Sequence, residues 1–167
     1  TEKERDVTRV ITGSVSPTVL NLADAVDAAA ARVRADHPDA AIETAVPATL
    51  AARALPEVEA ALAELIRNAL EHASAPDPSV EVSGARAGDE VTLTVRDEGP
   101  PIPESEYRVL TGEREMDEVY HGSGVGLWLV HWVVDLSSGR VEFTADDSGN
   151  TITVSLPASD RTVPEMR

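Results

Sequence analysis

Hydrophobic residues recur along this chain at two spacings, one helical and one extended, and the two kinds of segment alternate. Apolar positions three and four residues apart predict helices over residues 21–36 and 56–73. Pro56 suits the first turn of the second helix, where a missing N–H costs no hydrogen bond. We also expect a short helical piece over 104–110 and an apolar helix over 127–136.

Strands are predicted where apolar residues alternate with polar ones. Residues 79–87 and 90–97 form the clearest pair, joined as a hairpin by a short turn. Further strands are expected over 41–46, 49–54, 141–145 and 151–156, the last two as a second hairpin. Helices alternating with strand pairs indicate an α/β fold. Specifically, we expect a two-layer sandwich in which helices cover one face of a mixed, mostly antiparallel sheet.

The chain is long enough for one domain with its own core, which we expect over residues 15–157. Residues 1–14 are charged and helix-prone, which predicts either the end of an upstream helix or a linker. Residues 158–167 predict a loose C-terminal tail.

Charge changes the range of possible partners. The 167 residues include 30 acidic and 14 basic side chains, the formal net charge is −16, and Lys3 is the only lysine. Such a surface repels nucleic acids and anionic membranes, which excludes direct binding to nucleic acid as a main function. Abundant carboxylates with almost no lysine favour adaptation to a high-salt cytoplasm, as in a halophile. Cysteine is absent, which rules out disulfides. Without a long apolar run, we expect a cytoplasmic domain that makes no direct membrane contact.

Three polar residues stack on one side of the predicted central helix. Glu64, Asn68 and His72 follow one another at intervals of four residues beside an apolar stripe. The side-chain oxygen of Asn68 suits Mg²⁺, a hard cation, and Glu64 could accept or orient a proton. On this stretch alone, a solvated polar face explains the pattern equally well.

Two glycine-containing segments add further candidate chemistry. Asp97 and Gly99 end a strand, where a carboxylate could accept a hydrogen bond from an exocyclic amine or could simply form a turn. Gly122, Gly124 and Gly126 open a helix, whose N-terminal amides could bind phosphate. A simple helix-entry turn has the same pattern.

Together, the three segments resemble the ATP-binding boxes of the superfamily of sensor histidine kinases, Hsp90, type II topoisomerases and MutL proteins. ELIRNALEH is similar to the N box, DEGPPIP to the G1 box and GSGVGLWLV to the G2 box, in the expected order. The resemblance covers roughly residues 18–157 and is closest to the catalytic ATP-binding domain of sensor histidine kinases.

The resemblance implies a role for each matching position near the phosphates. Asn68 would coordinate Mg²⁺ on the triphosphate, Glu64 would be a catalytic base or would orient water, and His72 would reach the phosphates. Residues 104–121 would form a mobile lid. The glycine-rich segment would close over the phosphates. It would do so through Gly122, Gly124 and Gly126, together with the backbone amides of Val125 and Leu127.

On the base side, the resemblance implies that Asp97 reads the adenine N6 amine. Gly99 would leave room for the base, Ile102 would pack on it, and Thr151 would lie near it. The cofactors implied are therefore ATP and Mg²⁺.

The implied function is the catalytic domain of a two-component sensor histidine kinase. It would donate the γ-phosphate of ATP to a histidine in an upstream dimerisation domain absent from this chain, and a response regulator would be the further partner. None of the four histidines has the context of a phosphoacceptor. An anti-sigma-type serine kinase on the same fold, and a non-catalytic nucleotide-sensing or protein-interaction module, remain alternatives.

Two positions depart from the family pattern. The G1 segment has Pro101 where glycine is usual, which stiffens its backbone. The N box has Glu71 where a basic residue is usual, which removes one cation from the phosphates. Arg114 in the lid could substitute for that cation, or could be an ordinary surface arginine. These departures motivate the non-catalytic alternative.

Overall fold

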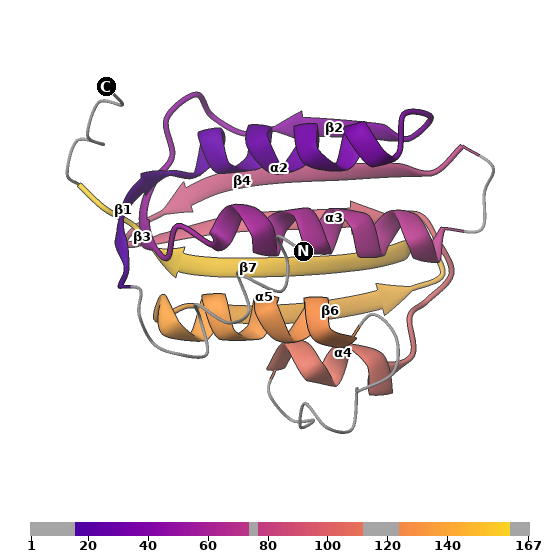
Figure 1. The fold of residues 1–167 in the computed structure, drawn as a ribbon. Coiled ribbons are helices and arrows are strands. Elements are labelled where there is room, and N and C mark those ends of the chain that lie inside the picture. The colour runs from indigo at the N-terminus through magenta and orange to yellow at the C-terminus, as the bar shows by residue number, and fades with distance from the viewer. Residues whose placement is uncertain (1–15, 74–76, 112–123, 161–167) are drawn as a thin grey trace.

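The computed structural model describes residues 16–73, 77–111 and 124–160 as a sheet covered by helices. In Figure 1, α2, α3 and α5 lie side by side across one face of the large sheet, and α4 lies beside α5. The elements in chain order are β1 Thr18–Asn21, α2 Leu22–Asp36, β2 Ala41–Ala45, β3 Ala51–Ala54, α3 Val58–His72, β4 Ser79–Ala87, β5 Glu90–Asp97, α4 Glu104–Thr111, α5 Gly124–Leu136, β6 Arg140–Asp146 and β7 Gly149–Pro157.

The large sheet has five strands in the order β2-β4-β5-β7-β6. β2 runs parallel to β4, and the other three neighbouring pairs are antiparallel. The sheet is therefore mixed and mostly antiparallel, with helices on one face, as the sequence predicts. The two predicted hairpins, β4–β5 and β6–β7, are both confirmed.

The core lies between the helices and the inner face of the sheet, where residues alternate with outward-facing ones. Along β5, Val91, Leu93 and Val95 are buried while the residues between them are more exposed. α3 supplies the centre of the helical layer, because it packs on α2 on one side and α5 on the other. Its polar residues at 64 and 68 are thereby carried into the interior. The fold thus buries the polar face that the sequence left undecided.

The N-terminal region differs from the sequence-based expectation. Residues 41–46 and 49–54 were expected to be successive strands, but β2 joins the large sheet whereas β3 pairs with β1, a strand that the pattern did not predict. Asn21 holds this junction together. Its side-chain oxygen accepts hydrogen bonds from Ala23 N at 3.1 Å, capping α2, and from Leu50 N at 2.9 Å.

Two predicted boundaries also change. α5 begins at Gly124 rather than Leu127, so part of the glycine-rich segment is helical. The tail expected from residue 158 is not loose at its start: Ser159 is buried, and its backbone N–H donates to Ala51 O at 3.1 Å. Ala158 forms a bridge with Ala52 of β3. The C-terminal end of β7 is therefore tied to the small β1–β3 sheet.

Candidate nucleotide-binding site

Asn68 provides the clearest sign of a ligand position. Its residue is only 8% exposed, on the α3 face that packs toward α5, and its side-chain oxygen has no hydrogen-bond partner among the described residues. Leaving such a buried acceptor unsatisfied costs about 1–3 kcal/mol. An amide oxygen is a ligand that Mg²⁺ accepts. The residue therefore fits the metal role that the sequence assigned to it.

Glu64 lies one turn before Asn68 and is equally buried. One carboxylate oxygen, Oε1, accepts a hydrogen bond from Arg67 Nη1 at 2.8 Å. The other side of the carboxylate meets Gly126 in the first turn of α5, where an added Cβ would lie 2.8 Å from Glu64 Cδ. Glycine at this position lets α3 and α5 approach closely, and a side chain there would displace the Glu64 carboxylate. This contact joins the predicted N box to the predicted G2 box.

Asp97 ends β5 with its side chain buried. Its Oδ1 accepts hydrogen bonds from Gly99 N at 2.8 Å and from Asn150 Nδ2 at 3.0 Å. Both bonds end on the same oxygen. Within the described part of the chain, Oδ2 carries no hydrogen bond and can accept one from an exocyclic amine. The geometry agrees with the base-reading role implied for Asp97.

Asn150 is a site residue that the sequence analysis missed. It is 1% exposed and lies opposite Asp97 in the pairing of β7 with β5. Besides its bond to Asp97, its Nδ2 donates to Pro100 O at 2.9 Å, and its Oδ1 accepts from Ile102 N at 2.8 Å. One buried amide thus fixes the whole loop that follows Asp97. Gly149 before it has a φ of 138° and packs on the Asp97 backbone, a position that suits glycine alone.

Thr151 is not brought to Asp97. It pairs with Arg96, whose side chain lies on the outer face of the sheet, whereas Asp97 and Asn150 lie on the helix-covered face. Successive residues of a strand point to opposite faces. The structure therefore brings Asn150, and not Thr151, next to Asp97.

The end of α3 meets the loop that follows β5. Gly99 packs against the last residue of that helix, because a Cβ there would be 3.3 Å from His72 O. His72 is half-buried, and Ile102 is 7% exposed and anchored through its backbone to Asn150. The end of α3, the end of β5 and the start of β7 thus meet at one edge of the fold (Figure 1).

The glycine-rich segment is described only from Gly124 onward. Gly124 begins α5 and Val125 follows it, and Gly126 and Leu127 are buried in the first turn. The first amides of a helix have no intrahelical partner and suit an anion. Gly122 and Arg114 lie outside the described residues, as does the lid beyond α4, so their expected roles stay predictions.

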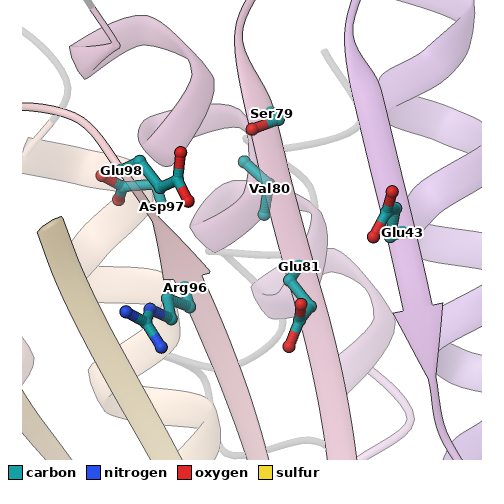
Figure 2. A pocket seen from close by; sticks show the side chains of 7 residues that line it. All are labelled: Glu43, Ser79, Val80, Glu81, Arg96, Asp97 and Glu98. Atoms are coloured by element: carbon teal, nitrogen blue, oxygen red, sulfur yellow. The ribbon is translucent and has the colours of Figure 1, made fainter. Parts of the chain in front are cut away.

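A cavity of about 350 Å³ opens beside the end of β5. Figure 2 shows Glu43, Glu81 and Arg96 on three neighbouring strands, with Asp97 and Glu98 above them. In the strand register, Glu81 lies opposite Glu43 of β2 on one side and opposite Arg96 of β5 on the other. Four carboxylates against one arginine repel a triphosphate. The lining of this cavity therefore does not suit phosphate, and the start of α5, which packs on α3, is the better candidate for a phosphate subsite.

The chemistry of the site residues suits ATP and Mg²⁺. A metal-bound triphosphate and an adenine require three kinds of group. The described residues supply a buried acceptor without a partner, the first amides of α5, which have no intrahelical partner, and a buried carboxylate with one oxygen available. No helix among the described residues is long and apolar enough to cross a lipid bilayer.

The chain has a mixed sheet covered by helices, and its polar site residues gather where the ends of α3 and β5 meet the start of β7. This arrangement defines a nucleotide-binding α/β domain. Residues 55–160 match the family described as histidine kinase-, DNA gyrase B- and HSP90-like ATPases, and the chain belongs to that family. The resemblance stated from the three boxes is confirmed.

Several individual proteins resemble the chain. It is 33% identical over 167 residues to the signal transduction histidine-protein kinase AfsQ2 of Streptomyces coelicolor, covering 93% of this chain and 30% of that protein. It is 32% identical over 101 residues to the sensor protein PfeS of Pseudomonas aeruginosa, covering 59% of this chain and 22% of that protein. Among solved structures, the mycobacterial sensor histidine kinase MprB is 25% identical with a TM-score of 0.67, covering 85% of this chain and 97% of that one. The chain thus spans less than a third of the length of these two curated relatives.

Proposed function

We propose that this chain is the catalytic ATP-binding domain of a sensor histidine kinase, which binds Mg·ATP and presents its γ-phosphate to a histidine outside the chain. The observation that carries the proposal is the buried side-chain oxygen of Asn68, which has no hydrogen-bond partner among the described residues and lies one helical turn from the Glu64 carboxylate that meets Gly126. Family membership and the similarity to sensor kinases support it. Because ATP is a cytoplasmic substrate, we infer that the domain works in the cytoplasm.

In this proposal the protein mainly positions the nucleotide and stabilises charge, as expected for phosphoryl transfer. Asp97 Oδ2 accepts the adenine N6 hydrogen bond while Oδ1 is held by Gly99 and Asn150. Bound at Asn68, Mg²⁺ would supply positive charge to the phosphate oxygens. The first amides of α5 bind the same phosphates, and His72, in the last turn of α3, is the side chain assigned to reach them. Glu64, one helical turn before Asn68, orients the group that attacks the γ-phosphate.

The partners follow from the same proposal. The acceptor histidine belongs to a dimerisation domain of the same protein, and the phosphoryl group passes on to a response regulator. Similarity to proteins named as sensor kinases supports both partners. The net charge of −16 supports the exclusion of nucleic acid as a partner.

Binding tests the site directly. Asp97→Asn replaces the acceptor charge by an amide, and Asn68→Ala removes the metal-facing oxygen. We expect each change to weaken Mg·ATP binding by about 10- to 100-fold, because hydrogen bonds to charged groups contribute about 1.5–3 kcal/mol. Isothermal calorimetry with the wild-type chain and with Thr151→Ala, on the outer face, provides the comparison. Unchanged affinity in both site variants would reject the site.

Phosphotransfer tests the reaction. The domain is mixed with a dimerising segment that bears the acceptor histidine, labelled ATP is added, and acid-labile phosphate is measured. We expect labelling that depends on both Asn68 and Mg²⁺. Glu71, exposed on α3, supports the alternative of a binding-only module. Bound ATP without any transfer would favour that module, and acid-stable phosphoserine on a partner would favour a serine kinase.

A further inference from the structure

Arg67 makes a contact that no role assigned so far explains. It is the only arginine or lysine of α3, and it lies between Glu64 and Asn68 in sequence. Its Nη1 donates to Glu64 Oε1 at 2.8 Å, and its Nη2 lies 3.7 Å from Asp36 Oδ2 at the end of α2. The Arg67 side chain is 25% exposed, whereas that of Glu64 is 11% exposed. A polar chain therefore runs from α2 through Arg67 to the buried carboxylate.

The first consequence concerns orientation. Arg67 fixes one oxygen of the Glu64 carboxylate, and the other oxygen is directed at Gly126 in the first turn of α5. The guanidinium is planar and rigid, so a hydrogen bond from it restricts the plane of the carboxylate. Asp36 lies near the second nitrogen of the same group. The orientation of the Glu64 carboxylate therefore depends on its hydrogen bond with Arg67.

The second consequence concerns charge. Glu64 is buried next to the helix start where phosphates would bind, and a carboxylate there repels a polyanion. Arg67 offsets that charge from the partly exposed side. Glu71, one turn further along α3, carries the opposite sign and is exposed, so it gives no such compensation. The helix therefore places its one permanent cation at the carboxylate that needs it.

We propose that Arg67 is a positioning residue of the nucleotide site: it holds Glu64 against the start of α5 and offsets its charge, so that a metal-bound triphosphate can approach. This inference rests on the proposed function. It concerns the phosphate end of the ligand and leaves the adenine end, at Asp97, unaffected.

The test is a double-mutant cycle on the full 167-residue chain, with calorimetric titration of Mg·ATP and of adenosine. The variants are Arg67→Ala, Arg67→Lys, Glu64→Gln and the double change of both residues. Arg32→Ala is the matched control, because Arg32 pairs with Glu59 at 3.2 Å and also links α2 to α3. Thermal unfolding of each variant separates loss of binding from loss of fold.

We expect Arg67→Ala to weaken Mg·ATP binding by about tenfold and to change adenosine binding by less than about twofold. Arg67→Lys restores the charge but not the planar donor group, and should recover part of the loss. In the Glu64→Gln background, removing Arg67 should cost less than about twofold, because the charge that it offsets is gone. Arg32→Ala should match the wild-type chain in both titrations.

Three results would overturn the inference: an unchanged Mg·ATP affinity in Arg67→Ala, an equal loss in the Glu64→Gln background, or an equal loss for adenosine. Arg67→Ala leaves a buried carboxylate without its cation and could fail to fold. In that case Arg67→Lys, and the comparison of Glu64→Gln with the double variant, decide the matter. A wild-type chain that binds no Mg·ATP would instead reject the proposed function itself.

Discussion

Asn150 is a single side chain that connects three parts of the adenine side of the site. It bonds to the Asp97 carboxylate, to the Pro100 carbonyl and to the Ile102 amide, while being almost completely buried. A buried amide with every group engaged restricts its neighbours more than its net energy suggests. The stiffness expected from Pro101 is thus reinforced by a hydrogen-bonded support on the neighbouring strand.

Replacing Asn150 by alanine should therefore affect both stability and binding. The change leaves the Ile102 amide and the Pro100 carbonyl without this partner, which we expect to lower the free energy of unfolding by about 1–3 kcal/mol. Adenosine affinity should fall as well, because Asp97 loses the donor that orients it. Urea denaturation and adenosine titration measure the two effects.

Thr151→Ala is the control for this change, one residue along the same strand but on the outer face. Thr151 is half-buried and lies away from the site contacts, and surface substitutions of this kind usually stay within about 0.5 kcal/mol. If Asn150→Ala and Thr151→Ala behaved alike in both measurements, the supporting role of Asn150 would be wrong.

At the scale of elements, the sequence predicts what is local. Helix α3, the hairpins and the burial of one strand face follow from periodicity, and Pro56 marks the start of the central helix correctly to within two residues. α5 was predicted to start three residues late, because glycine usually argues against helix. Gly126 is nevertheless helical, because α5 packs on α3 at this point, where the Glu64 carboxylate lies at the place of an added Cβ. That reason is a tertiary contact and has no local signal.

The site shows the same division between local and long-range information. Glu64, Asn68 and Asp97 could be found because each belongs to a short motif. Asn150 could not, because its bond to Asp97 spans 53 residues and depends on the pairing of β5 with β7. Period-two alternation predicts that strands exist but leaves their order in the sheet open. For the same reason, the sequence did not indicate that β3 would leave the large sheet and pair with β1.

The β6–β7 turn offers a prediction at this scale, because it places Gly149 and Asn150. Hydrogen bonds to Asp146 from the hydroxyl and the backbone N–H of Ser148 lower the pKa of Asp146 below its ordinary value of 3.8. Since the folded pKa is depressed, the stabilisation is present above the unfolded pKa and is lost as the pH falls through the folded one. Below neutral pH, the turn should weaken only in the acidic range under 3.8.

Ser148→Ala should raise the pKa of Asp146 toward 3.8, because the side-chain hydrogen bond is the largest cause of the shift. A carbon-detected NMR titration of the Asp146 carboxyl measures this directly. Ser83→Ala, on β4, is the control and should leave the titration unchanged. A titration identical in Ser148→Ala and wild type would show that the turn hydrogen bonds do not set the pKa.

At the scale of the whole molecule, charge is the dominant feature. The chain has 30 acidic and 14 basic side chains. Ion pairs such as Arg140–Glu90 and Arg86–Asp160 are exposed. Exposed pairs contribute about 0–1 kcal/mol each, so they compensate the excess of negative charge only weakly. The folded chain therefore repels itself, and it also repels the triphosphate that it is proposed to bind.

Added salt should consequently stabilise this protein. The Debye length is about 30 Å at 0.01 M and about 10 Å at 0.1 M salt, so most long-range repulsion disappears within this interval. We expect the urea midpoint to rise between these two KCl concentrations, and the affinity for Mg·ATP to rise with it at fixed Mg²⁺. A midpoint that falls would mean that screened ion pairs matter more than the net charge. A gain that appears only at molar salt would come from general exclusion of salt from the protein surface.

The predicted adaptation to a high-salt cytoplasm requires in addition that Mg·ATP binding persists at molar KCl. Charges are screened within about 3 Å at that concentration, so only the direct contacts of Asn68, Asp97 and the α5 amides remain.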